Sequence, residues 1–337
     1  MSKRREIICE YQPYMDRPPV PRQALYGQAC SNDGPTVNTW RPTWIANAQK
    51  NHARFGSFAD RGLGKLWGKH SLRPAIVVGS GPSLKENAAV LRDNPGIPVL
   101  SCLHNFHYLE DLGVHVDYYV SLDAGPVVVE EVSEGGTKSA EEYWAASKGK
   151  TLLCYIATDP KLLELWQGDV YFFSCPVPDP EVIKAQEELE RFVTDISSGG
   201  NVLGACVYIA KAILGANPIA FVGADFSFSY TDKFHGWDSK YDKDIGQYLR
   251  MTDVYGNSVK TWQSYANFKA FFDWLAETVP GIYFNCTEGG TLGAYPGGNI
   301  RSIRQMDLAD FLRMYRLHEE VREQCEAPAT AARKILY

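Results

Sequence analysis

From Arg73 onward, short apolar runs alternate with segments of helical pattern, and this alternation constrains the fold more than any other feature. Continuous apolar runs without strict alternation are typical of parallel strands covered on both faces. Strands and helices in alternation predict an α/β fold, here a Rossmann-like, doubly wound, mostly parallel sheet. The runs are PAIVV (74–78), IPVLSC (97–102), VDYYVSL (116–122), TLLCYI (151–156), DVYFFS (169–174), PIAFVG (218–223) and GIYFNC (281–286).

The segments on either side of this region differ from it. Residues 1–72 are rich in proline, asparagine and aromatic residues, which predicts an irregular N-terminal extension that packs on the core, with one helix at 45–55. Residues 73–302 would form the Rossmann-like domain, including a buried helix over 199–216. Residues 303–337 would form a C-terminal helix and tail, with an apolar stripe of Met306, Phe311, Leu312 and Tyr315. This helix would pack at an edge or form a homo-oligomer contact.

Composition limits the binding partners and the cellular compartment that we expect for this chain. The net charge of −6 argues against a nucleic-acid partner, because non-specific binding needs clustered cations, and only the start MSKRRE is basic. The sequence has no run of 18 apolar residues and no signal-peptide core, so we expect no membrane span and a cytoplasmic protein. The eight cysteines form no C-x-x-C motif, and we expect them to be reduced and mostly buried.

The turn after the first apolar run is rich in small residues. It comprises Gly79, Ser80, Gly81, Pro82 and Ser83 and precedes a helical segment. Glycines let a backbone approach a ligand, and the start of a helix favours anions, so this turn is a candidate phosphate site. It lacks the ending of the P-loop and the third glycine of the dinucleotide motif. The alternative is a tight strand-to-helix turn with a good cap.

A second stretch has the same character. Ser197, Ser198, Gly199 and Gly200 immediately precede the predicted buried helix. This helix start could contact the same anion. Alternatively, Ser198 only caps the helix and the glycines allow close packing.

Polar residues follow several predicted strands. Asn105, Asp123 and Asp225 lie just beyond strand ends, where open α/β sheets bind ligands, although each could be a simple turn residue. His235 follows ten residues after Asp225 and could act as a general base or be an ordinary surface histidine.

Two further features have weaker chemical signals. His104 and His107 have a spacing that can hold zinc, but no third ligand is evident, so we interpret them as a helix start. The loop 285–299 carries five glycines and includes Thr287, Glu288 and Gly289. Such a loop either closes over an acceptor or turns corners.

The order of these motifs resembles a known superfamily. VVGSGPSL, HNFHYLEDLGVHVDYYVSLD, SSGGNVLGACVYIAKAILGANPIAFVGADFSF, a histidine–glycine pair and NCTEGGT occur in this order over roughly 73–302. This order resembles 6-hydroxymethylpterin diphosphokinase MptE-like proteins and the motility accessory factors that glycosylate flagellin. It is also similar to bacterial sialyltransferases that use CMP-sialic acid. Ser80 and Asp123 depart from the sialyltransferase pattern, in which asparagine is usual.

The resemblance implies a transferase that binds a nucleotide donor. Gly79 to Ser83 would line the donor phosphate, Asn105 and Asp123 would meet the ribose or phosphate, and Ser197 to Gly200 would reach the base or phosphate. Asp225 and His235 fall at acceptor or general-base positions, and Thr287 to Gly289 would form the acceptor loop. Replacing Gly81 by a β-branched residue would then abolish nucleotide binding and leave the fold intact.

Three functions remain open at this point. In a glycosyl transfer, which we favour, His235 takes the proton of an acceptor hydroxyl, the donor is a CMP-linked sugar, and no metal is needed. In a diphosphate transfer from ATP to a hydroxymethylpterin-type alcohol, Asp123 and Asp225 would hold Mg²⁺. The third is a non-catalytic nucleotide-binding or assembly module. The sequence does not identify the acceptor.

Overall fold

The computed structural model describes residues 10–94, 96–133, 135–177, 179–190, 193–237 and 245–318. The basic start of the chain and the predicted tail beyond residue 318 lie outside these ranges. No helix within them has the length and apolar character needed to cross a bilayer.

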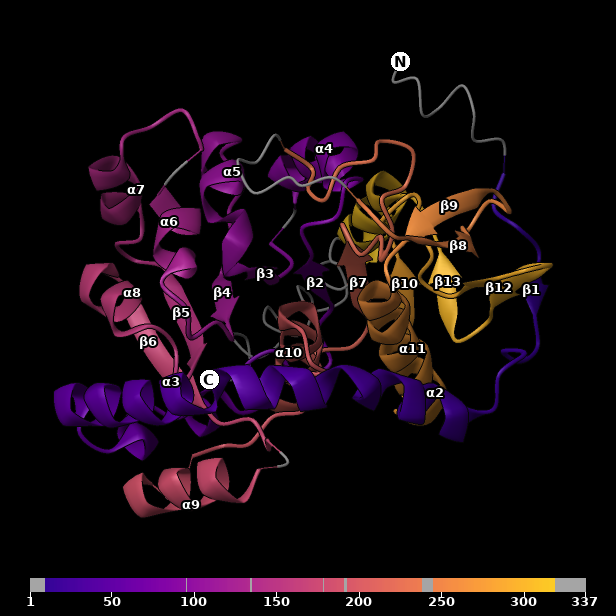
Figure 1. Cartoon of the computed structure of the whole chain (residues 1–337). Helices are drawn as coiled ribbons and strands as arrows, with labels where there is room; N and C mark the ends of the chain where they lie inside the picture. Colours follow the sequence, from indigo (N-terminus) through magenta and orange to yellow (C-terminus); the bar gives the residue numbers. More distant parts are fainter. Residues whose placement is uncertain are drawn as a thin grey trace, which may run out of the picture.

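The centre of the molecule is an eight-stranded sheet in the order β13-β10-β7-β2-β3-β4-β5-β6, and every neighbouring pair is parallel (Figure 1). The predicted α/β fold is therefore confirmed, and all seven apolar runs form strands of this sheet. The strands β2, β3, β4 and β7 are completely buried and β5 is almost so, as expected when helices cover both faces, whereas the edge strand β6 has an exposed first residue. Their bounds are β2 (Ala75–Val78), β3 (Val99–Cys102), β4 (Tyr118–Ser121), β5 (Thr151–Tyr155), β6 (Asp169–Phe173), β7 (Ile219–Val222), β10 (Tyr283–Asn285) and β13 (Ile303–Gln305).

The strand order contains one reversal. The chain proceeds from β2 through β3, β4 and β5 to β6 at one edge, then returns to β7 on the other side of β2 and continues outward. The carboxyl ends of β2 and β7 therefore flank the topological switch point, where open α/β sheets bind their ligands.

The helices connect these strands. The predicted buried helix is present as α10, extended by a π-helical turn at Ile209–Ile213. The α-helices that follow β2 in the chain are α4 (Leu84–Asn87), α5 (Phe106–Asp111), α6 (Val127–Ser133), α7 (Ala140–Ala146), α8 (Pro160–Leu165), α9 (Pro180–Leu189), α10 (Val202–Tyr208) and α11 (Gln263–Thr278). Outside the main sheet lie the hairpin of β8 (Leu249–Thr252) and β9 (Ser258–Thr261), and a small sheet of β1 (Tyr14–Met15), β12 (Gly298–Ile300) and β11 (Ala294–Tyr295).

The predicted C-terminal helix starts later than expected. Residues 303–305 form β13, which pairs with β10 as the edge strand, and residues 308–318 are helical. Ile303 and Gln305 are buried while Arg304 is exposed, so this short segment follows the two-residue period of a strand. Of the predicted stripe, Phe311, Leu312 and Tyr315 are buried on the helix, whereas Met306 precedes it.

The N-terminal extension is more helical than the sequence predicted. It contains α2 (Arg22–Ala29) and the 23-residue α3 (Asp33–Phe55), which continues through Pro42. Figure 1 shows both helices end to end along the lower side of the molecule. The Asn47 amide donates to the carbonyls of Ala124 and Ala157, at 2.9 and 3.2 Å, and these carbonyls lie beyond the ends of β4 and β5. Side-chain contacts to loop carbonyls therefore anchor α3 to the core.

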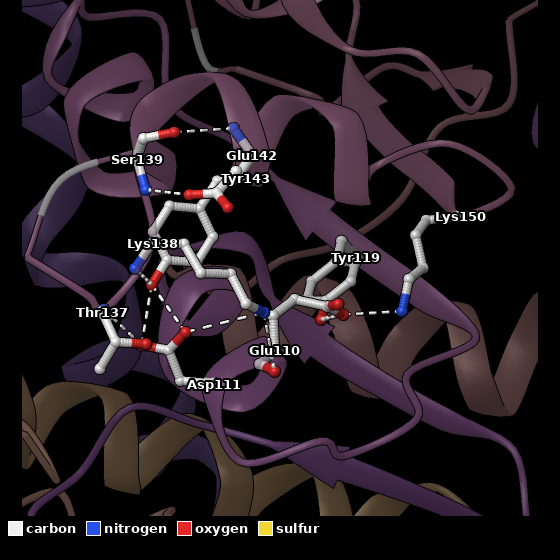
Figure 2. Close-up of polar contacts among 9 residues, drawn as sticks. All are labelled: Glu110, Asp111, Tyr119, Thr137, Lys138, Ser139, Glu142, Tyr143 and Lys150. Atoms are coloured by element: carbon white, nitrogen blue, oxygen red, sulfur yellow. Dashed lines mark hydrogen bonds and ion pairs between the residues drawn. The ribbon is translucent and has the colours of Figure 1, made fainter.

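A polar network holds α5 in place (Figure 2). Glu110 pairs with Lys150 at 2.6 Å, next to β5. Asp111 accepts hydrogen bonds from the Tyr143 hydroxyl and the Thr137 amide, each at 2.8 Å. Partial burial raises the pKa of Asp111, but these hydrogen bonds outweigh it and the net pKa is lowered. The position of α5 matters because the residues at its start belong to the candidate site.

Candidate active site

The loops that follow β2 and β7 pack against each other at the switch point. A Cβ atom on Gly79 would lie 2.6 Å from the Gly223 carbonyl oxygen, and one on Gly223 would lie 2.5 Å from the Gly79 carbonyl oxygen. A Cβ on Gly81 would lie 2.2 Å from the Asp225 carboxylate. The small residues of the turn 79–83, called the first turn below, are therefore required for close packing of two backbones.

The backbone amides of this turn have partners within the protein. The Gly79 and Gly81 amides donate to the carbonyls of Val222 and Gly223, at 2.8 and 2.9 Å. The Ser83 amide faces the Asp225 carboxylate at 3.2 Å, and α4, which follows, is only four residues long. The predicted phosphate role of Gly79 to Ser83 stays a prediction, and in this arrangement the Asp225 carboxyl group lies at the start of α4.

Asp225 is buried, and its carboxylate is fully engaged. It is 1% exposed, and it accepts hydrogen bonds from the hydroxyls of Ser83 and Ser229, each at 2.5 Å. Its backbone carbonyl accepts from the Thr291 amide at 2.8 Å. This residue ties together the loops after β2, β7 and β10, which suits a positioning role better than direct contact with an acceptor.

The predicted acceptor loop lies against the same residues. The Thr287 hydroxyl is completely buried and accepts from the Ala224 amide at 3.0 Å. Glu288 accepts from the Leu308 amide at 3.1 Å, at the start of the C-terminal helix. Gly289 is buried beside it. An acceptor-binding role for this loop stays a prediction, since its described contacts are structural.

Asn105 lies beneath the first turn. Its amide nitrogen donates to the Ser101 hydroxyl at 3.0 Å and to the Gly79 carbonyl at 3.2 Å. Its Oδ1 is buried and has no hydrogen-bond partner among the described residues. Asn105 therefore fixes the end of β2, and its predicted contact with a nucleotide stays a prediction.

The second glycine pair lies at the start of α10. Gly199 has a φ of +59° and packs on the Phe271 ring. The cap of α10 is Asn201, whose Oδ1 accepts from the Gly204 amide at 2.8 Å, so the alternative in which Ser198 caps this helix is wrong. A Cβ on Gly79 would lie 3.3 Å from Leu203, which places the start of α10 beside the first turn. The donor-binding role of Ser197 to Gly200 stays a prediction.

A cluster of histidines and carboxylates forms at the carboxyl ends of β3 and β4. His104, in the 3₁₀ turn after β3, has its Nδ1 3.0 Å from a carboxylate oxygen of Glu131 on α6. The rings of His104 and His235 have centroids 4.4 Å apart, and Trp237 stacks on His235 at 5.0 Å. A Cβ on Gly236 would lie 2.8 Å from the Lys85 amide. The segment that carries His235 therefore packs beside α4 and brings this cluster next to the switch point.

Asp123 belongs to the same cluster. It keeps exposed surface, but the surrounding protein removes enough water to raise its pKa to about 6. The Glu131 carboxylate adds to this increase, and His104 acts in the opposite direction. A carboxyl group that titrates close to neutral pH beside histidines is typical of functional sites.

Part of this cluster has no signal in the sequence. The pattern predicts a helix start for His104 and His107, which is confirmed by the 3₁₀ turn and α5, but it indicates no chemical role for His104. Glu131 and Trp237 carry no local signal, because only the fold brings α6 and the β7 loop to His104. The position of His104 just after a strand was the one available clue.

Comparison with known proteins identifies the family. The family model described as "6-hydroxymethylpterin diphosphokinase MptE-like" matches residues 44–231. The chain belongs to this MptE-like family. The resemblance to MptE-like proteins inferred from the motif order is therefore confirmed. No curated protein matches the chain.

A search of solved structures also finds a similar chain. It is the MAf glycosyltransferase from Magnetospirillum magneticum AMB-1, with 17% sequence identity and a TM-score of 0.49. The similarity covers 74% of this chain and 38% of the solved one, so the chain spans well under half of that protein's length.

The MptE-like match includes the first turn, Asn105, Asp123, Glu131 and Asp225, and it ends before His235. A diphosphokinase would use Mg²⁺, and the predicted ligands were Asp123 and Asp225. This pair does not fit a shared metal, because β2 and β3 lie between β7 and β4, and the two residues therefore follow strands about 14 Å apart. Both Asp225 oxygens also accept hydrogen bonds from buried serines. Within the described ranges, no group of three or more histidine, cysteine or acidic side chains is arranged to hold a metal ion.

Proposed function

We propose that this MptE-like protein is a nucleotide-dependent transferase that moves a group from a nucleotide donor to an acceptor hydroxyl. The observation that carries the proposal is the meeting of His104, His235, Asp123 and Glu131 at the carboxyl edge of the sheet, beside its switch point. Nucleotides bind at this place in α/β folds, and histidine is the side chain best suited to move protons near neutral pH.

Glycosyl transfer from a CMP-linked sugar is the reaction we favour. The acceptor oxygen forms a bond to the anomeric carbon, the bond between that carbon and the phosphate oxygen breaks, and the electron pair leaves with CMP. The acceptor proton passes to a histidine of the cluster, with His235 as the residue that meets the acceptor. At pH 7 Asp123 is mostly ionised, because its pKa is about 6, so it would accept a hydrogen bond from a ribose hydroxyl and repel a phosphate.

Diphosphate transfer from ATP to a hydroxymethylpterin-type alcohol is the second candidate. The family description supports it. The commitment of the Asp225 carboxylate to serines weighs against the predicted metal pair, and this is why the reaction ranks second. A nucleotide-binding module without catalytic activity is the third candidate, and the experiment below can distinguish it from the other two.

Thermal melting of the protein with CMP, CMP-sialic acid, a UDP-sugar, and ATP with or without Mg²⁺ tests the proposal. A nucleotide at about 100 times its Kd stabilises the folded state by about 2.7 kcal/mol, which gives a clear shift in Tm. We expect stabilisation by the cytidine compounds and slow release of CMP from CMP-sialic acid, with water as the acceptor. Stabilisation by ATP alone, dependent on Mg²⁺, would select the diphosphokinase. Binding without turnover would select the module, and no stabilisation by any nucleotide would contradict the proposal.

A further inference from the structure

Two histidines near the candidate site differ in the group that their Nδ1 atoms meet. His104 Nδ1 lies 3.0 Å from the Glu131 carboxylate, and His107 Nδ1 lies 2.9 Å from the backbone carbonyl of the same Glu131. Both rings contact Trp237. In each case Nε2 is buried and has no hydrogen-bond partner among the described residues. The two side chains therefore share these contacts and differ in the charge opposite Nδ1 and in exposure, since the His104 side chain is 18% exposed and His107 is 4% exposed.

This difference decides how each ring is oriented and which tautomer its Nδ1 partner favours. A carboxylate stabilises an imidazolium ion by a charge-assisted hydrogen bond, and a neutral carbonyl does so much less. For His107, burial outweighs the hydrogen bond to the carbonyl and lowers the pKa, which keeps the ring neutral. For His104, the carboxylate fixes the tautomer with hydrogen on Nδ1, so that the Nε2 lone pair is free to take a proton.

We propose that His104, held by Glu131, is the residue on which the proton of the acceptor hydroxyl comes to rest, and that Glu131 is its positioning residue. The inference rests on the proposed transferase function and deepens it, since the sequence suggested His235 alone. The cluster then resembles other sites in which a base is oriented by a third group.

The route of the proton follows from the packing. The rings of His104 and His235 lie beside each other, with centroids 4.4 Å apart, and Trp237 contacts both. No described residue forms a hydrogen bond with His104 Nε2, so in this proposal the His235 ring takes the acceptor proton and turns toward Nε2 to pass it on. The product state holds a neutral His235 and a His104 imidazolium next to the ionised Glu131. The proton returns to solvent after the transferred group has left.

Four variants test this assignment in the full-length chain: His104→Gln, Glu131→Gln, His235→Gln, and the matched control His107→Gln. CMP release from CMP-sialic acid is measured for each, together with CMP binding and the melting temperature. We expect His104→Gln and His235→Gln each to lower turnover by about 10²-fold or more, with CMP binding retained. The double variant should be no slower than the slower single variant, because the two residues act in series. His107→Gln should keep a rate near that of the wild type.

A spectroscopic measurement distinguishes loss of the His104 ring orientation from a general disturbance of the fold in the Glu131 variant. Nitrogen-15 NMR of the histidine rings should show that His104 is the tautomer with hydrogen on Nδ1. In Glu131→Gln the His104 Nδ1 signal should shift, because the carboxylate opposite it is gone, while the His107 signals should stay unchanged. A turnover of His104→Gln equal to that of His107→Gln, or losses that multiply in the double variant, would overturn the inference alone. A wild-type protein that neither binds nor cleaves CMP-sialic acid would overturn the favoured reaction, and the inference with it.

Discussion

The substitution Gly81→Ala should destabilise the protein strongly. The added Cβ would lie 2.2 Å from an Asp225 carboxylate oxygen and 2.7 Å from the Gly223 carbonyl oxygen. Overpacking of a tight site costs about 1–3 kcal/mol. If the carboxylate moves away, it also loses hydrogen bonds from Ser83 or Ser229, at about 1–3 kcal/mol for an incompletely satisfied buried group. Together we expect a loss of about 2–6 kcal/mol in the free energy of unfolding.

Urea unfolding at pH 7 measures this loss, and Gly27→Ala is the matched control. Gly27 lies in α2 with no atom within 4 Å of an added Cβ, so alanine there should be neutral or should stabilise the helix by up to about 1 kcal/mol. The sequence alone suggested that a larger residue at Gly81 would leave the fold intact, and the packing around Asp225 contradicts that expectation. A Gly81→Ala protein within about 0.5 kcal/mol of the wild type would refute the reasoning.

Three further predictions concern buried or titrating carboxylates. Asp273→Ala should cost about 3–5 kcal/mol in urea unfolding, because it leaves Lys269, only 3% exposed, without its ion-pair partner. Asp111→Asn should remove stability that is present at neutral pH and lost as the pH falls below about 4, because hydrogen bonds lower the pKa of this carboxyl group in the folded state. The raised pKa of Asp123 predicts that stability falls as the pH rises from about 4 to about 6, and Asp123→Asn should remove this slope.

Each of these predictions has a contrasting result. Glu188→Ala, in the exposed pair with Lys184, should cost under about 0.5 kcal/mol, and an Asp273→Ala loss of the same size would mean that the buried pair is not important. An Asp111→Asn protein with the pH profile of the wild type would exclude the proposed hydrogen-bond effect. For Asp123, an unchanged slope between pH 4 and 6 in the variant would show that another group titrates there.

Most of the central sheet was predictable because its strands are buried on both faces. Such strands consist of continuous apolar residues, and helical segments between them give the pattern a second, independent signal. The strand β13 was missed because it has three residues, includes the exposed Arg304 and directly precedes a helix with a stronger pattern. The helix α3 was underestimated because Pro42 and several polar residues weaken its local signal, while contacts such as that of Asn47 with Ala124 stabilise it.

The candidate site was predictable only in part. The polar residues at strand ends were found because the carboxyl edge is a general ligand position, and the structure places Asn105, Asp123 and Asp225 there. Their contacts depend on packing between distant segments, so the sequence could not show that Asp225 accepts a hydrogen bond from the Ser83 amide. It could not pair His104 with Glu131 either, because 27 positions separate them in the chain (131 − 104).

The central claim is that the carboxyl edge of the sheet, beside β2 and β7, binds a nucleotide donor. The most direct test is a crystal structure of the protein soaked with CMP. We predict that the nucleotide will contact residues at this edge, with its ribose near Asp123 and its phosphate within reach of the His104 and His235 cluster. A nucleotide bound elsewhere, for example in the hollow of about 380 Å³ lined by Asp60, Arg61, Lys65, Asp169, Val170 and Tyr171, would contradict the account.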